Sequence, residues 1–158
     1  MATTLEFAKS IEQELHEFRK LGFDMPKACL YGVDTDGLVV KASEHGDVYD
    51  MLDTTDVADL LTVYSHIAVA TTGWASPVRD NYEDDTPPSK HKDRRRVRLV
   101  VVADKDDMVS AIRFSDDADT VITDTGMATG SLADAIMVAV KRHPSTKPWD
   151  FLVGDDND

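Results

Sequence analysis

Two short apolar runs, residues 28–33 and 38–42, flank an Asp-Thr-Asp-Gly sequence at residues 34–37. β-prone segments on either side of an Asp-Gly pair are the strongest short-range indication of a β-hairpin, because glycine readily adopts the positive φ that such turns need. This feature therefore predicts antiparallel strand pairing in the first third of the chain.

Helical and extended patterns alternate through the rest of the sequence. Residues 3–21 carry apolar side chains at spacings of three and four, which predicts an amphipathic helix that ends before Gly22. A second helix is predicted from Thr54 or Thr55 to about Ser65, and a third over residues 131–143. Further strands are predicted, from their β-branched and apolar content, over residues 66–72, 95–103 and 108–114, with a short edge strand as a candidate over 120–123.

This order of elements predicts an α+β fold with a mostly antiparallel sheet of about five strands and three helices. Helix, two strands, helix, further strands and a final helix is an order that resembles the roadblock and profilin-like proteins. The resemblance implies a sheet with helices packed on it and carries no function by itself. We predict a single domain over residues 1–153, with a long exposed loop over 77–93 and a disordered acidic tail over 154–158.

The net charge of −13 limits the partners that this chain can attract. Thirty acidic residues stand against seventeen lysines and arginines. Such a field repels nucleic acids and anionic membranes at long range, so we predict no direct binding of either. The apolar runs are too short to cross a membrane, and the N-terminus lacks the pattern of a signal peptide. With a single cysteine, Cys29, these features predict a cytoplasmic protein.

The aspartates include a series with a period of three, between the predicted hairpin and the second predicted helix. Its members are Asp47, Asp50, Asp53, Asp56 and Asp59. If these side chains were exposed at a spacing close to that of DNA phosphates, the protein could occupy a DNA-binding partner as an acidic mimic. Their role in solubility is the simpler alternative.

The basic residues are concentrated, since six of the seventeen lie within residues 90–98. Alternation along a strand places Arg94, Arg96 and Arg98 on one face. Guanidinium groups in a row bind phosphates, carboxylates or acidic protein surfaces. An aromatic side chain, Trp74, follows another predicted strand at a position where it can shape a pocket. The predicted partner- or anion-binding residues are therefore Arg94, Arg96, Arg98 and Trp74.

Structural roles for these residues are the competing interpretation. Trp74 could close one end of the core, with its N–H bonded to a loop carbonyl. The arginines could pair internally with the aspartate series or with the acidic residues of the preceding loop, which are Asp80, Glu83, Asp84 and Asp85.

The first functional hypothesis is a non-catalytic module that binds a protein partner or a second copy of itself as a homodimer. The alternative is a small enzyme that binds an anionic substrate near Trp74 and the arginines, with His66 or His91 as its acid–base group. The acidic DNA mimic is the third hypothesis. The five histidines lack zinc-site spacing, and the sequence contains no phosphate-binding glycine loop, so we predict no metal or cofactor and assign no catalytic residue.

Overall fold

The computed structural model describes residues 3–18, 23–75, 94–124 and 131–141, and within them six strands pair into one antiparallel sheet. The strand order is β2-β1-β3-β4-β5-β6. The strands are β1 (Ala28–Val33), β2 (Val39–His45), β3 (His66–Ala75), β4 (Arg95–Ala103), β5 (Met108–Phe114) and β6 (Asp117–Asp124). The helices are α1 (Thr4–Phe18), α2 (Val48–Thr54), α3 (Val57–Val63) and α4 (Ser131–Lys141).

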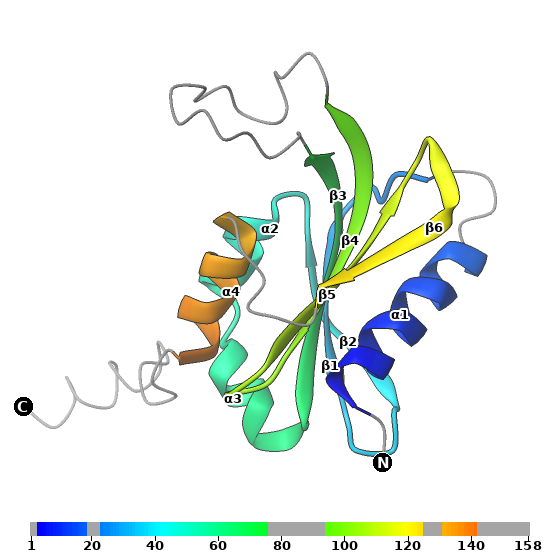
Figure 1. The fold of residues 1–158 in the computed structure, drawn as a ribbon. Helices are drawn as coiled ribbons and strands as arrows, with labels where there is room; N and C mark the ends of the chain where they lie inside the picture. The colour runs from blue at the N-terminus through cyan, green and yellow to red at the C-terminus, as the bar shows by residue number, and fades with distance from the viewer. Residues whose placement is uncertain (1–2, 19–22, 76–93, 125–130, 142–158) are drawn as a thin grey trace, which may run out of the picture.

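The sheet is the middle layer of three, with α1 on one face and α2, α3 and α4 on the other (Figure 1). Both faces of the central strands are therefore buried, and alternate residues of β4 serve different cores. Val100 and Val102 belong to the core beneath α1, whereas Val101 and Ala103 belong to the core beneath the other three helices. This explains why β4 reads as a continuous apolar run rather than as an alternating one.

The predicted β1–β2 hairpin is confirmed, and its turn depends on Asp34 and Gly37. The Asp34 carboxylate accepts hydrogen bonds from the backbone N–H groups of Asp36 and Leu38, both at 2.9 Å. Gly37 has a φ of 87°, in the left-handed region that strains a residue with a Cβ. The sequence of the turn thus matches its backbone geometry.

The α+β fold with its antiparallel sheet is confirmed, while the predicted element count is slightly low. The described residues contain six strands and four helices, because β6 is a full strand and α2 is an additional helix. α2 forms because the Asp47 carboxylate caps it, accepting from Tyr49 N–H at 2.8 Å, and because Met51 and Leu52 are buried. A second cap, Asp56, starts the next helix at Val57 rather than at Thr54 or Thr55.

Other sequence-based predictions are not tested. The roadblock- and profilin-like order stays a prediction. The predicted loop over residues 77–93 and the predicted tail over 154–158 lie outside the described residues.

Both edges of the sheet carry features that oppose pairing with another strand. In β2 the register with β1 shifts between Leu30 and Tyr31, and Lys41 pairs with Glu44 at 3.0 Å on the exposed surface. On β6, the side chains of Asp117 and Asp119 are exposed. Bulges and charges of this kind are how natural sheets avoid edge-to-edge association.

Candidate functional site

Arg98, one of the predicted binding residues, is fully buried between β4 and α1. Its Nε donates to the Glu12 carboxylate at 2.9 Å, and its Nη1 donates to the Phe23 carbonyl at 3.2 Å. A side chain enclosed in this way cannot contact a partner, so the structure gives Arg98 a role in holding α1 on the sheet.

The buried network around Arg98 includes a second arginine on the neighbouring strand. Arg113 lies directly opposite Arg98 in the β4–β5 register, and its Nε donates to the other oxygen of Glu12 at 2.7 Å. At its margin, His16 Nδ1 lies 2.9 Å from Arg98 Nη2, and Gln13 accepts from Arg113 at 3.1 Å. Within the described part of the chain, no buried side-chain polar atom lacks a hydrogen-bond partner. Glu12 therefore bridges two guanidinium groups that would otherwise repel each other inside the protein.

Arg94 and Arg96, by contrast, come together with Trp74 on the surface. Trp74 and Arg96 are cross-strand partners at the end of β3 and the start of β4. The Cζ atoms of Arg94 and Arg96 lie 4.7 and 5.0 Å from the centroid of the indole ring. Trp74 remains 39% exposed. We call these three residues the Trp74 surface.

Neighbouring polar groups fix the geometry of this surface. Arg96 Nε donates to the Asp24 carboxylate at 2.8 Å, and Arg96 Nη2 donates to Thr72 Oγ1 at 3.3 Å. Thr72 Oγ1 in turn accepts from the backbone N–H of Met25 at 3.3 Å. The indole is thus held beside an anchored guanidinium group, which is an ordered arrangement for an exposed side chain.

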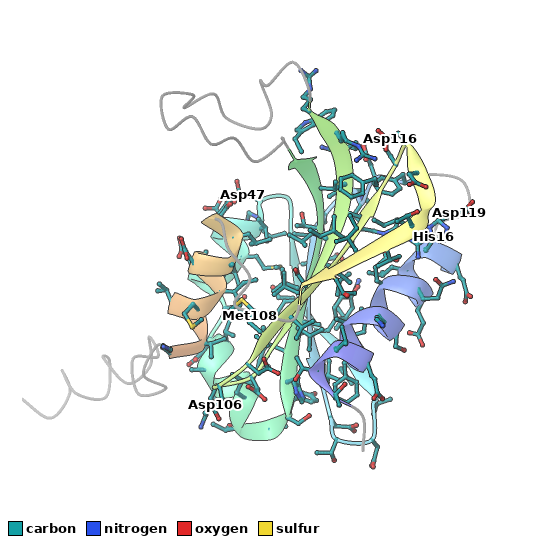
Figure 2. All side chains as sticks on the ribbon, in the orientation of Figure 1. His16, Asp47, Asp106, Met108, Asp116 and Asp119 are labelled. Carbon is teal, nitrogen blue, oxygen red and sulfur yellow. The ribbon has the colours of Figure 1, made fainter. Side chains whose placement is uncertain are left out.

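The remaining arginine, Arg95, points to the opposite face of the sheet with its own aromatic and acidic partners. Its Cζ lies 3.9 Å from the centroid of the Phe114 ring, and its guanidinium donates to Asp116 at 2.6 and 3.0 Å. Asp116 lies at the upper end of the sheet in Figure 2, whereas Asp106 marks the lower end. Cation–π contacts occur about once per 70–80 residues, so three contacts from successive residues indicate a local concentration at this end of β4.

Arg95 changes the titration of its partner. The hydrogen bond from Arg95 and the attraction of its charge hold the pKa of Asp116 below its ordinary value, against a smaller opposing effect of desolvation. A carboxylate with a lowered pKa stabilises the fold above its unfolded-state pKa, and this stabilisation is lost as the pH falls through the folded-state pKa.

We expect an NMR titration of the Asp116 carboxyl carbon to give a midpoint below that of an ordinary aspartate. In Arg95→Gln the midpoint should rise toward the ordinary value, because the charged donor is gone. Identical midpoints in the two proteins would contradict the pairing.

The described acid–base candidate, His66, lies at the opposite end of β3 from Trp74. Eight residue steps at roughly 3.3 Å each separate the two positions by about 26 Å. His91 lies outside the described residues. The enzyme hypothesis needs a histidine beside the arginines, and the described part of the chain does not place His66 there.

His66 belongs instead to a polar cluster at its own end of the sheet. Its Nδ1 lies 2.9 Å from Ser65 Oγ, and its Nε2 lies 3.1 Å from Thr4 Oγ1 and 3.6 Å from the Asp104 carboxylate. Ser65 Oγ donates its proton to the Val33 carbonyl at 3.0 Å. The cluster joins the first turn of α1 to the sheet.

The aspartate series divides into structural and exposed members. Asp47 and Asp56 are the N-caps of α2 and α3, and Figure 2 shows Asp47 at the start of α2. The side chains of Asp50 and Asp53 are exposed, and Asp59 is half-buried. Among the described residues, the arginines of β4 and β5 form ion pairs with Glu12, Asp24 and Asp116.

Other kinds of site find little support in the described residues. They contain no group of three His, Cys, Asp or Glu side chains arranged to hold a metal ion. No helix in the described part of the chain has both the length and the apolar character needed to cross a membrane.

Comparison with known proteins gives no match among protein-family models, curated proteins or solved structures. A function must therefore be inferred from the residues of this chain.

The sequence did not point to four residues that bind the arginines of β4 or lie opposite them. These residues are Glu12, Arg113, Asp24 and Asp116. A signal for Glu12 was available, since it follows Ile11 and lies one turn after Ala8 on the apolar side of an amphipathic helix. A carboxylate at such a position predicts a buried cationic partner. For Asp24 and Asp116 we find no comparable signal.

Proposed function

We propose that this protein is a non-catalytic interaction module that binds a protein partner, or a second copy of itself, through the Trp74 surface. The observation that carries the proposal is the exposed indole of Trp74, which is in cation–π contact with both Arg94 and Arg96. Tryptophan and arginine are the residues most enriched where binding energy is concentrated in protein interfaces. Because these side chains are already held in place before binding, less side-chain conformational entropy is lost on association.

The same geometry favours docking of side chains over addition of a strand. Both sheet edges carry charges, and β2 also carries an irregularity in its register. The Trp74 surface lies at the end of two inner strands, away from these edges. A partner would therefore bind across the strand ends rather than extend the sheet.

The alternatives receive less support. The enzyme hypothesis would need an acid–base group near the Trp74 surface, and His66 is at the far end of β3. The DNA-mimic hypothesis would need a continuous acidic surface, and two of its five aspartates are already used as helix caps. A cytoplasmic location is part of the proposal and is supported by the buried, unpaired thiol of Cys29. A roadblock- or profilin-like order of helices and strands would be compatible with an interaction module.

Trp74→Ala is the variant that tests the proposed function. Light scattering at low and high salt would measure self-association, and the immobilised protein would be used to capture partners from a lysate of the source organism. Trp74→Ala should weaken the dimer or the captured complex by about tenfold or more, since it removes the central side chain of the surface.

The matched control is Val63→Ala, which truncates a more exposed apolar residue at the end of α3. This variant should bind as the wild type does. The proposal fails if the wild type is monomeric at both salt concentrations and captures no protein that Trp74→Ala loses. It also fails if both variants weaken binding equally.

A further inference from the structure

We infer that Arg94 binds a carboxylate of the partner, so that the Trp74 surface recognises an aspartate or glutamate flanked by apolar residues in a protein segment. This inference rests on the proposed function and adds the chemistry of the partner. It follows from a comparison of Arg94, Arg95 and Arg96. Each of them contacts an aromatic ring, and two of them also bind a carboxylate of the chain itself.

Each of these arginines has its guanidinium carbon over an aromatic ring. Arg94 and Arg96 contact Trp74, and Arg95 contacts Phe114. A cation–π contact uses none of the guanidinium N–H donors in a hydrogen bond, so they stay available to a planar acceptor such as a carboxylate.

Two of the three already hold such a carboxylate from the chain itself. Arg95 binds Asp116 at 2.6 Å, and Arg96 binds Asp24 at 2.8 Å. Among the residues that the structure describes, no acidic side chain is paired with Arg94, which is exposed. The internal pairs show which ligand this arrangement takes, and Arg94 presents the same arrangement to an external one.

A protein carboxylate fits this surface better than a nucleic acid does. Asp24 and Asp116 pair with Arg96 and Arg95, so among the described residues at this end of β4 a single arginine, Arg94, has no acidic partner, whereas a phosphate backbone needs a row of cations. The net charge of −13 also opposes the approach of a long polyanion. The exposed indole beside Arg94 favours an apolar neighbour next to the bound carboxylate.

The probe is an acetylated Leu-Glu-Leu tripeptide amide at millimolar concentration, followed by the NMR signals of the Trp74 indole N–H and the Arg94 Nε–H. Both signals should move and saturate with the Leu-Glu-Leu peptide. The matched Leu-Gln-Leu peptide and the ten-nucleotide strand dT10 should leave them in place.

Arg94→Gln should weaken the binding of Leu-Glu-Leu by about tenfold, and Arg94→Lys should weaken it less, since the charge stays while the fork is lost. Lys105→Gln removes one exposed positive charge from the turn at the other end of β4 and should have no effect. The inference is overturned if the peptide moves neither signal, if the two glutamine variants behave alike, or if dT10 binds as well.

Two failures can be told apart. If the partner complex depends on Trp74 but is indifferent to Arg94→Gln, the carboxylate inference falls and the proposed function stands. If no complex depends on Trp74, the proposed function falls with it.

Discussion

Glu12→Gln is expected to destabilise the protein by about 3–5 kcal/mol, the loss typical of breaking a buried ion pair at one partner. Glu12 has no exposed surface and is the carboxylate shared by Arg98 and Arg113. Without its charge, two guanidinium groups face each other across β4 and β5 beneath α1. Urea denaturation followed by circular dichroism measures the change in the free energy of unfolding.

The control for this variant is Glu14→Gln, which removes an exposed carboxylate from the same helix and should change stability by less than about 0.5 kcal/mol. If Glu12→Gln does not fold, a triple variant that combines Glu12→Leu, Arg98→Met and Arg113→Met should recover much of the stability. Apolar residues of similar volume commonly replace a buried ion pair or triad without loss of stability. Equal stability of Glu12→Gln and Glu14→Gln would show that the charge of Glu12 does not stabilise the network with the two arginines.

The sequence was informative where local chemistry decides the structure. The β1–β2 hairpin followed from its Asp-Gly turn, and the face shared by Arg94 and Arg96 followed from strand alternation. The sequence pattern does not predict α2, because its cap, Asp47, is one of several regularly spaced aspartates and only two of its seven residues, Met51 and Leu52, are buried.

The burial and ion-pair partner of each arginine could not be predicted from the sequence, because they depend on contacts between residues far apart in the chain. Arg98 meets Glu12 across 86 positions and Arg96 meets Asp24 across 72. Strand alternation treats Arg96 and Arg98 as equivalent, yet α1 covers one and leaves the other half-exposed. Of the three arginines predicted for the candidate site, the structure therefore leaves Arg94 and Arg96, which contact Trp74.

Gly32→Ala is expected to destabilise the protein by about 1–3 kcal/mol, the range found for inserting atoms into a packed interior. Gly32 is buried in β1, and a Cβ at this position would overlap the ring of Tyr64. The overlap includes Cγ at the base of the Tyr64 ring, so the ring must change its rotamer or the backbone must shift to make room. The loss should appear in urea denaturation as a lower midpoint with an unchanged slope.

Two further variants separate this overlap from a general effect of alanine in a strand. Gly73→Ala places a Cβ in β3 where no heavy atom lies within 4 Å, so its stability should equal that of the wild type or exceed it by up to about 1 kcal/mol through a less flexible unfolded chain. In a Tyr64→Ala background, Gly32→Ala should lose most of its effect, because the two substitutions act on one contact and are not additive. If Gly32→Ala is as harmful without the ring as with it, Tyr64 is not the reason that β1 has a glycine at this position.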